Sequence, residues 1–118
     1  MILRESYKLM KLVKAVIRPH RLDSVHEALV DIGVTDLTAS EVKSFGRQLG
    51  HAEIHRGAAY RVAFMPMVQV EVVVADSMVE RVLATILEVV GTDRLGDGKV
   101  FVCDVLSAHT RETDEAAL

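Results

Sequence analysis

Two helix-like stripes of apolar residues alternate along this chain with short β-branched runs, and this alternation limits the possible folds more than any other feature. The first stripe places apolar residues three and four positions apart within residues 22–32 and is followed by Gly33. The second covers residues 79–90, begins near the capping-box pattern Ser77-Met-Val-Glu80 and ends at Gly91. This spacing predicts two helices, each with one buried face and a glycine at its end.

The β-branched runs on either side of these helices predict four strands. The first is followed by Arg18-Pro19, which disfavours a helix there, and the third should be interrupted or bulged near Pro66. The order predicts an α+β, ferredoxin-like βαββαβ unit, with two helices on one face of an antiparallel sheet. Apolar residues also reach the other face, so we expect self-association to cover it. The predicted strands are residues 12–17, 37–42, 60–64 with 67–74, and 100–106.

The composition bounds the class of protein. The 118 residues, half of them hydrophobic, allow one domain with one core. A net charge of −3 and 4% aromatic residues argue against nucleic-acid binding, which needs clustered cations and stacking rings. The single cysteine, Cys103, excludes an internal disulfide. Without a long apolar run or an apolar start, we expect no membrane insertion, no signal peptide and a cytoplasmic protein.

A polar segment of about eighteen residues, 43–60, separates the second and third predicted strands. A hairpin needs only a few residues to turn, and a longer loop inside a compact domain is usually functional or disordered. The segment therefore predicts a recognition loop on a rigid scaffold.

Three functions fit this order of elements on general grounds. An RNA-recognition module would need aromatic residues on the first and third strands, where this chain has Val and Ile. An acylphosphatase-like enzyme would hold phosphate with the basic loop Arg18-Pro-His-Arg21, but the supporting Asn is missing from the expected strand. A purely structural oligomer would leave the long loop without a role.

The segment Gly96-Asp97-Gly98-Lys99 is a candidate anion site. Two glycines allow successive backbone N–H groups to converge on an anion, and Lys99 adds a point charge suited to a polyphosphate. The same residues also suit a tight turn that enters the fourth strand, because Asp-Gly is a common turn pair.

Four motifs together resemble the PII signal-transduction family, over residues 10–106 and without a gap. They are Ile17-Arg-Pro-His-Arg-Leu22, Glu41-Val-Lys-Ser-Phe-Gly-Arg-Gln48, His55-Arg-Gly-Ala-Ala-Tyr60 and Gly96-Asp-Gly-Lys-Val-Phe-Val102. The resemblance implies a regulatory homotrimer and not an enzyme, with three adenine-nucleotide sites in the clefts between subunits. It also implies that ATP or ADP and 2-oxoglutarate set the shape of the long loop, which docks on a transporter or enzyme of nitrogen metabolism.

The same resemblance implies the organisation of the chain. We expect an N-terminal extension of residues 1–9 and a single domain of residues 10–118. Within this domain we expect the long loop at about 45–60, the phosphate loop at about 94–99 and a short C-terminal tail at 107–118.

Matching positions assign roles to individual residues. Thr38 and Val73 match residues that hold the adenine, and Glu71 matches an acid near the ribose. Gln48 matches a ligand of Mg²⁺ that acts beside 2-oxoglutarate, and an amide oxygen suits this hard ion. Tyr60 matches a tyrosine that some members have uridylylated or adenylylated. The phosphate contacts are assigned to Gly46, Arg47, Gln48, Gly96, Asp97, Gly98, Lys99 and Arg111.

The chain also departs from the family pattern. Met67 follows Pro66 where the family has a lysine that pairs with a 2-oxoglutarate carboxylate, and Arg111 stands where the family has two arginines. His55 replaces a tyrosine of the signature. These changes weaken the case for 2-oxoglutarate and allow ADP or AMP to compete with ATP. The alternative is a PII-like protein of inorganic-carbon metabolism, associated with carboxysomes or bicarbonate uptake, that binds ADP or AMP with bicarbonate.

Overall fold

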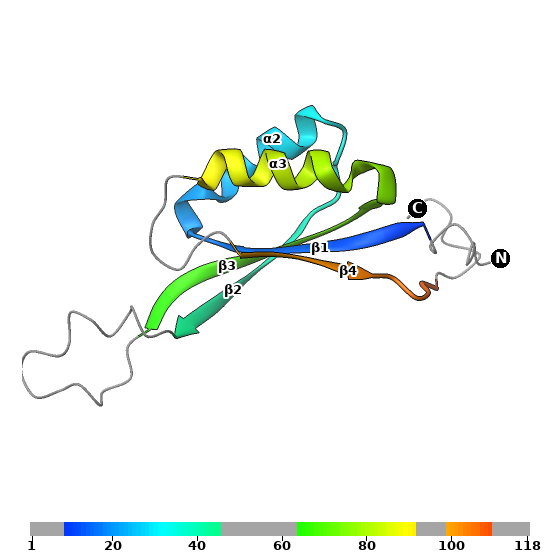
Figure 1. Cartoon of the computed structure of the whole chain (residues 1–118). Coiled ribbons are helices and arrows are strands. Elements are labelled where there is room, and N and C mark those ends of the chain that lie inside the picture. Colours follow the sequence, from blue (N-terminus) through cyan, green and yellow to red (C-terminus); the bar gives the residue numbers. More distant parts are fainter. Residues whose placement is uncertain (1–8, 46–63, 92–98, 110–118) are drawn as a thin grey trace, which may run out of the picture.

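The computed structural model describes residues 9–45, 64–91 and 99–109. These residues form a four-stranded sheet with both helices on one face (Figure 1). The ferredoxin-like α+β fold expected from the sequence is therefore confirmed. In chain order the elements are β1 (Met10–Ile17), a 3₁₀ turn (Pro19–Arg21), α2 (Leu22–Asp31), β2 (Thr38–Phe45), β3 (Phe64–Ala75), a second 3₁₀ turn (Asp76–Met78), α3 (Val79–Val90) and β4 (Lys99–Asp104).

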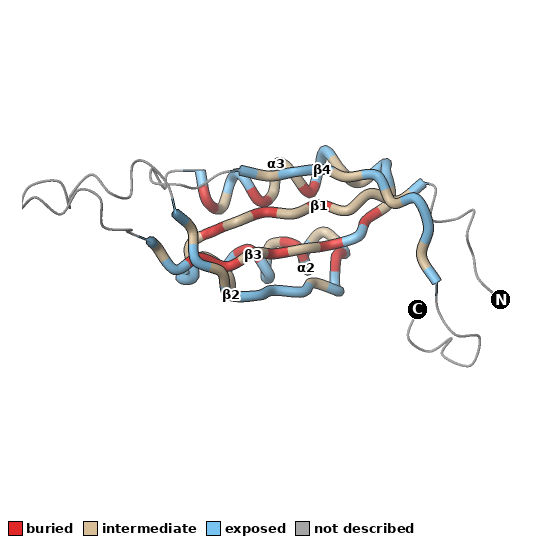
Figure 2. Tube along the Cα trace, turned by 90° about the horizontal axis from the view of Figure 1, so that it is seen from below, coloured by how far each residue is buried: buried red, intermediate tan, exposed pale blue. Residues whose placement is uncertain are grey.

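The strands are antiparallel and lie in the order β2-β3-β1-β4, which makes β2 and β4 the two edges. The central strands β1 and β3 alternate buried and partly exposed residues, whereas β2 at its edge is mostly exposed (Figure 2). Side chains point alternately to the two faces of a strand, so one set lies under the helices and the other on the open face. On β1, for example, Val13, Ala15 and Ile17 are buried.

The core lies between this sheet face and the helices. Val82, Ile86 and Val90 recur every four residues on α3 and are at most 2% exposed. Val25 and Leu29 on α2 are fully buried. The two apolar stripes of the sequence therefore form the helical half of the core. No helix among the described residues meets the length and apolarity needed to cross a membrane.

The expected interruption of the third strand at Pro66 is wrong. Pairing between β2 and β3 continues one residue at a time from Thr38 opposite Glu71, through Lys43 opposite Pro66, to Phe45 opposite Phe64. β1 pairs with β3 only as far as Val68, so β3 has β2 as its only described neighbour at Pro66. A proline is tolerated where one side of a strand needs no donor. The predicted strand residues 60–63 lie outside the described residues.

The capping-box prediction is also wrong. Ser77 lies within the 3₁₀ turn, and the residue before the first turn of α3 is Met78, which makes no side-chain capping bond. The tight turn places Ser77 one position too early to reach the free N–H groups of α3. Gly33 follows α2 with φ of 96°, the left-handed conformation predicted for it, and Gly91 ends α3 in a right-handed conformation.

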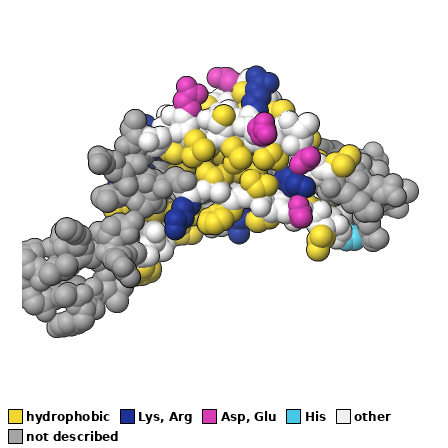
Figure 3. Space-filling model, viewed as in Figure 1, with side chains coloured by type: hydrophobic (Ala, Val, Ile, Leu, Met, Phe, Trp, Pro, Cys, Tyr) yellow, Lys and Arg dark blue, Asp and Glu magenta, His cyan; other side chains and the backbone are white. Residues whose placement is uncertain are grey.

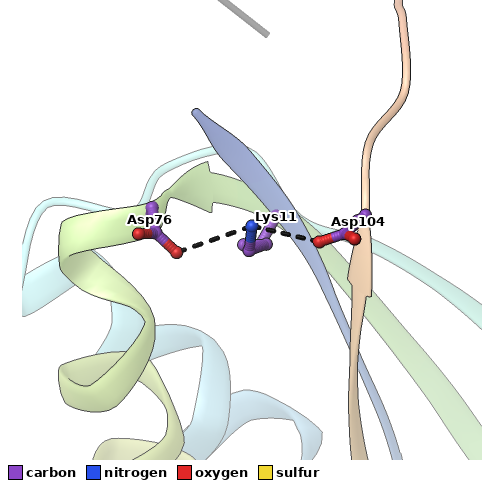
Figure 4. A network of polar contacts seen from close by, with 3 residues as sticks. All are labelled: Lys11, Asp76 and Asp104. Carbon is purple, nitrogen blue, oxygen red and sulfur yellow. Dashed lines mark ion pairs between the residues drawn. The ribbon is translucent and has the colours of Figure 1, made fainter. Parts of the chain in front are cut away.

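Lys11 links three elements at the start of β1 (Figure 4). Its Nζ lies 3.0 Å from an Asp104 carboxylate oxygen on β4 and 3.7 Å from one of Asp76 after β3. The hydrogen bond to Asp104 is the main cause that raises the pKa of Lys11 above its usual 10.5, so the ammonium keeps its charge at neutral pH. Lys11 therefore holds the end of β4 beside the start of the α3 segment.

Candidate functional site

Three of the residues that the sequence assigns to a nucleotide form one patch on the open face of the sheet. Thr38 at the start of β2 is directly opposite Glu71 on β3, and Val73 is two residues further along β3 on the same face. Directly paired side chains lie about 5 Å apart at Cβ, and same-face neighbours along a strand about 7 Å apart. Thr38 is exposed and Val73 is 47% exposed, so both are available to a ligand.

β3 extends beyond its partner at this point. β2 ends its pairing at Glu71, whereas β1 continues to pair with β3 as far as Ala75. We call residues 72–75 the overhang of β3. Every second residue of an antiparallel strand directs its N–H and C=O to the same side. The overhang therefore presents backbone hydrogen-bond donors and acceptors along the edge of β3 where β2 no longer pairs with it.

An open pocket of about 270 Å³ lies beside the overhang. The segment after α2, Gly33 to Asp36, forms one wall, and Val73, Val74 and Ala75 of the overhang form another. The sequence analysis missed the segment 33–36. Its signal is weak, because a glycine followed by short polar residues is equally typical of an ordinary helix-to-strand connection. Met10 and Met78 complete the lining.

The carboxylate of Glu71 is held by two neighbours on the open face. Lys14 Nζ on β1 lies 3.8 Å from Glu71 Oε2, and Gln69 Nε2 donates to the same oxygen at 3.4 Å. Lys14 is opposite Glu71 in the β1–β3 register, just as Thr38 is opposite it in the β2–β3 register. Thr38, Glu71 and Lys14 thus form a polar row across three adjacent strands. The sequence analysis did not single out Lys14 or Gln69.

Lys99, the described residue of the predicted phosphate loop, lies on the other edge of the sheet. It begins β4 and is opposite Val16 of β1, so it shares the open face with Glu71. Its side chain is exposed. Two strands, β3 and β1, separate β4 from β2.

The stem of the long loop is closed by an aromatic pair on the helix side of the sheet. The rings of Phe45 and Phe64 lie 5.8 Å apart at an angle of 54°, and Lys43 Nζ is 4.9 Å from the centre of the Phe64 ring. Both rings remain about half exposed. This contact joins the last residue before position 46 to the first residue after position 63.

Several predicted residues lie outside the described residues. These are the loop-base residues Gly46, Arg47 and Gln48, the phosphate-loop residues Gly96, Asp97 and Gly98, and the residues His55, Tyr60 and Arg111. Within residues 9–45, 64–91 and 99–109, no cluster of His, Cys, Asp or Glu forms a metal site. The Mg²⁺ role of Gln48 remains a prediction.

Met67, the residue that departs from the family pattern, is 1% exposed. It is opposite Val42 of β2, which places it on the same face as Glu71, and it does not belong to the core cluster beneath the helices. The position is thus an apolar, enclosed site on the face of the candidate nucleotide patch.

Apolar side chains gather in a band where α3 and β4 lie at the surface (Figure 3). Leu87 of α3 and Val102 of β4 are each 43% exposed, while Leu83 and Val100 pack partly against the core. On the open face of β4, Phe101 is 52% exposed. The edge formed by β4 therefore exposes apolar surface toward both sides of the sheet.

Comparison with known proteins identifies the family. A model described as nitrogen regulatory protein P-II matches residues 10–115. Nitrogen regulatory protein P-II of Klebsiella oxytoca and P-II 1 of Escherichia coli K12 are each 47% identical over 112 residues, covering 92% of this chain and 100% of the relative. A crystal structure of Arabidopsis thaliana PII bound to citrate aligns with a TM-score of 0.64 and 34% identity, covering 83% of this chain and 78% of that chain. The chain therefore belongs to the PII family of nitrogen regulatory proteins, which are signalling regulators and not enzymes.

Proposed function

We propose that this protein senses adenine nucleotides in clefts between the subunits of a homotrimer and controls a transporter or enzyme of nitrogen metabolism through its long loop. The observation that carries the proposal is the division of the predicted site between opposite edges of one sheet. Thr38, Glu71 and Val73 belong to the β2 edge, and Lys99 to the β4 edge.

The distances support a site shared between chains. Phe45 lies seven positions after Thr38, about 23 Å of extended strand, and directly precedes the loop-base residues. Only a ribose separates an adenine from its phosphates. We therefore assign the adenine contact of Thr38 and the phosphate contacts of residues 46–48 to different chains. A neighbouring subunit that brings its phosphate-binding end to this patch removes the conflict.

The roles divide accordingly. The pocket beside the overhang takes the adenine, with Thr38 and Val73 at its border, and Glu71 faces the ribose. The neighbouring subunit supplies the phosphate contacts and, through Gln48, an oxygen ligand for Mg²⁺. Tyr60 is the proposed site of nucleotidylylation, and the protein acts in the cytoplasm. The phosphate-binding residues are Gly46, Arg47, Gln48, Gly96, Asp97, Gly98, Lys99 and Arg111.

Replacing Lys99 with alanine should weaken ATP and ADP binding by about 1–3 kcal/mol, the scale of a hydrogen bond to a charged group. Titration calorimetry with ATP, ADP and AMP measures this directly. The Lys43→Ala variant is the matched control, since Lys43 lies on the opposite face of the sheet, over the Phe64 ring. Equal affinities in wild type and Lys99→Ala would place the phosphates elsewhere.

Light scattering at micromolar concentration should give the mass of three chains. The exposed apolar residues of the β4 edge, Phe101 and Val102 among them, and the division of the nucleotide site motivate this expectation. Val102→Asp places a charge in the apolar band and should shift the protein toward the monomer, whereas Asp104→Asn, at the end of the same strand, should not. A wild-type monomer would remove both the trimer and the shared site.

The buried Met67 favours a second candidate, a PII-like role in inorganic-carbon metabolism with ADP or AMP and bicarbonate. An apolar side chain that is 1% exposed offers no charge to the second carboxylate of 2-oxoglutarate. Bicarbonate lacks that second carboxylate. Calorimetry with ADP or AMP, with and without bicarbonate, separates the two candidates, because only the second predicts that bicarbonate tightens nucleotide binding.

A further inference from the structure

We infer that Lys14, assisted by Gln69, positions the Glu71 carboxylate to recognise ribose hydroxyl groups and thereby makes the site selective for ribonucleotides over deoxyribonucleotides. This inference rests on the adenine-nucleotide site proposed above, and it concerns two residues to which neither the motifs nor the relatives assign a role.

Two side chains fix the geometry of the Glu71 carboxylate. Lys14 Nζ and Gln69 Nε2 both approach Oε2 of Glu71, at 3.8 and 3.4 Å. These are the two contacts that the described residues make with the Glu71 carboxylate, and both involve Oε2. An ionised carboxylate only accepts hydrogen bonds, and Oε1 is left to accept one from a hydroxyl. The pair therefore fixes one oxygen and presents the other.

The pair of Lys14 and Glu71 lies on a partly exposed surface. Lys14 and Glu71 are 36% and 35% exposed, so in the isolated chain water reaches both and the ion pair adds little stability. Besides Gln69 and Thr38, the pair has apolar neighbours on the open face, Val16 on β1 and Val73 on β3. A subunit that covers this face would remove water from the pair. A carboxylate without a partner would then be unfavourable, so Lys14 keeps Glu71 paired and in place.

The polar row lies next to the pocket. Glu71 is the last residue of β3 that pairs with β2, immediately before the overhang that borders the pocket. A base held at Val73 places its ribose within reach of the next same-face residue, Glu71, about 7 Å away. A site built to accept a hydroxyl hydrogen bond discriminates against an analogue that lacks the hydroxyl.

The test compares ATP with 2′-deoxy-ATP and 3′-deoxy-ATP by titration calorimetry on the assembled protein. Wild type should prefer ATP to at least one deoxy analogue by about tenfold, the effect of one hydrogen bond to a charged group. Lys14→Met should reduce this ratio of affinities to about threefold or less, chiefly by weakening the binding of ATP. Lys14→Arg should restore the ratio. Lys43→Met, the same substitution on the other face, should leave the ratio unchanged.

The outcomes separate this inference from the proposed function. Wild type that binds no adenine nucleotide removes both. Wild type that binds ATP and both deoxy analogues equally, or Lys14→Met with the wild-type ratio, overturns this inference and leaves the nucleotide site intact. If light scattering shows that Lys14→Met fails to assemble, Gln69→Leu removes the other Oε2 contact without a change of charge. It should lower the ratio about twofold, and an unchanged ratio in that variant also overturns the inference.

Discussion

Truncating Ile86 to alanine should lower the free energy of unfolding by about 2–5 kcal/mol, the usual cost of deleting a large aliphatic side chain from a packed core. Ile86 lies at the centre of the buried stripe of α3 and is 1% exposed. Urea unfolding of wild type and variant at equal protein concentration measures the loss, since assembly makes stability depend on concentration.

A residue of the other helix provides the control. Val30 is on α2 and 40% exposed, so Val30→Ala removes contacts that water already partly replaces. Its expected cost is about 1 kcal/mol or less. Equal losses for the two variants would contradict the prediction, because burial between helix and sheet would then not set the cost.

Replacing Met67 with lysine should create or strengthen 2-oxoglutarate binding roughly ten- to hundredfold, equivalent to about 1.5–3 kcal/mol for a charge-assisted hydrogen bond. Wild type should bind the ligand weakly or not at all, because its second carboxylate meets a buried thioether without a partner. Titration of 2-oxoglutarate into protein loaded with ATP and Mg²⁺ measures the difference. Tight micromolar binding by wild type would contradict the prediction.

The control for this gain is Met65→Lys. Met65 lies two residues earlier on β3 and on the same face, but it is only partly buried. Met65→Lys adds the same positive charge near the same surface, so a purely long-range electrostatic attraction would strengthen 2-oxoglutarate binding in both variants. A gain in 2-oxoglutarate affinity that is confined to Met67→Lys would assign the carboxylate contact to position 67. The new ammonium should also lower the stability of the ligand-free protein, because position 67 is enclosed.

The elements of the fold were predictable because helix and strand periodicities are local. The stripe that contains Val82, Ile86 and Val90 identifies α3 without any knowledge of its partners. Gly33 could be placed correctly because its left-handed conformation depends only on the end of the helix. Pro66 was misjudged because its tolerance depends on where β1 ends, which is a property of the whole sheet.

The site was predictable to a smaller extent. Thr38, Glu71 and Val73 came from single positions that match the family, and the register explains why three residues on two strands form one patch. Lys14 and Gln69 carry no motif, because Lys14 meets the Glu71 carboxylate across strands and Gln69 meets it from two residues earlier on β3. The pocket beside residues 33–36 depends on the unequal lengths of β2 and β3 pairing, which no local pattern encodes.

The overhang of β3 has a consequence for how this protein can change over evolution. In the proposed site, a base that binds the main chain of residues 72–75 would meet groups that nearly every amino acid provides in the same place. Scanning those positions with alanine would miss such a contact, while a proline or a shift in the end of β2 would abolish it. Recognition of the base can thus be retained while substitutions elsewhere, at Met67 for example, change which other effectors bind.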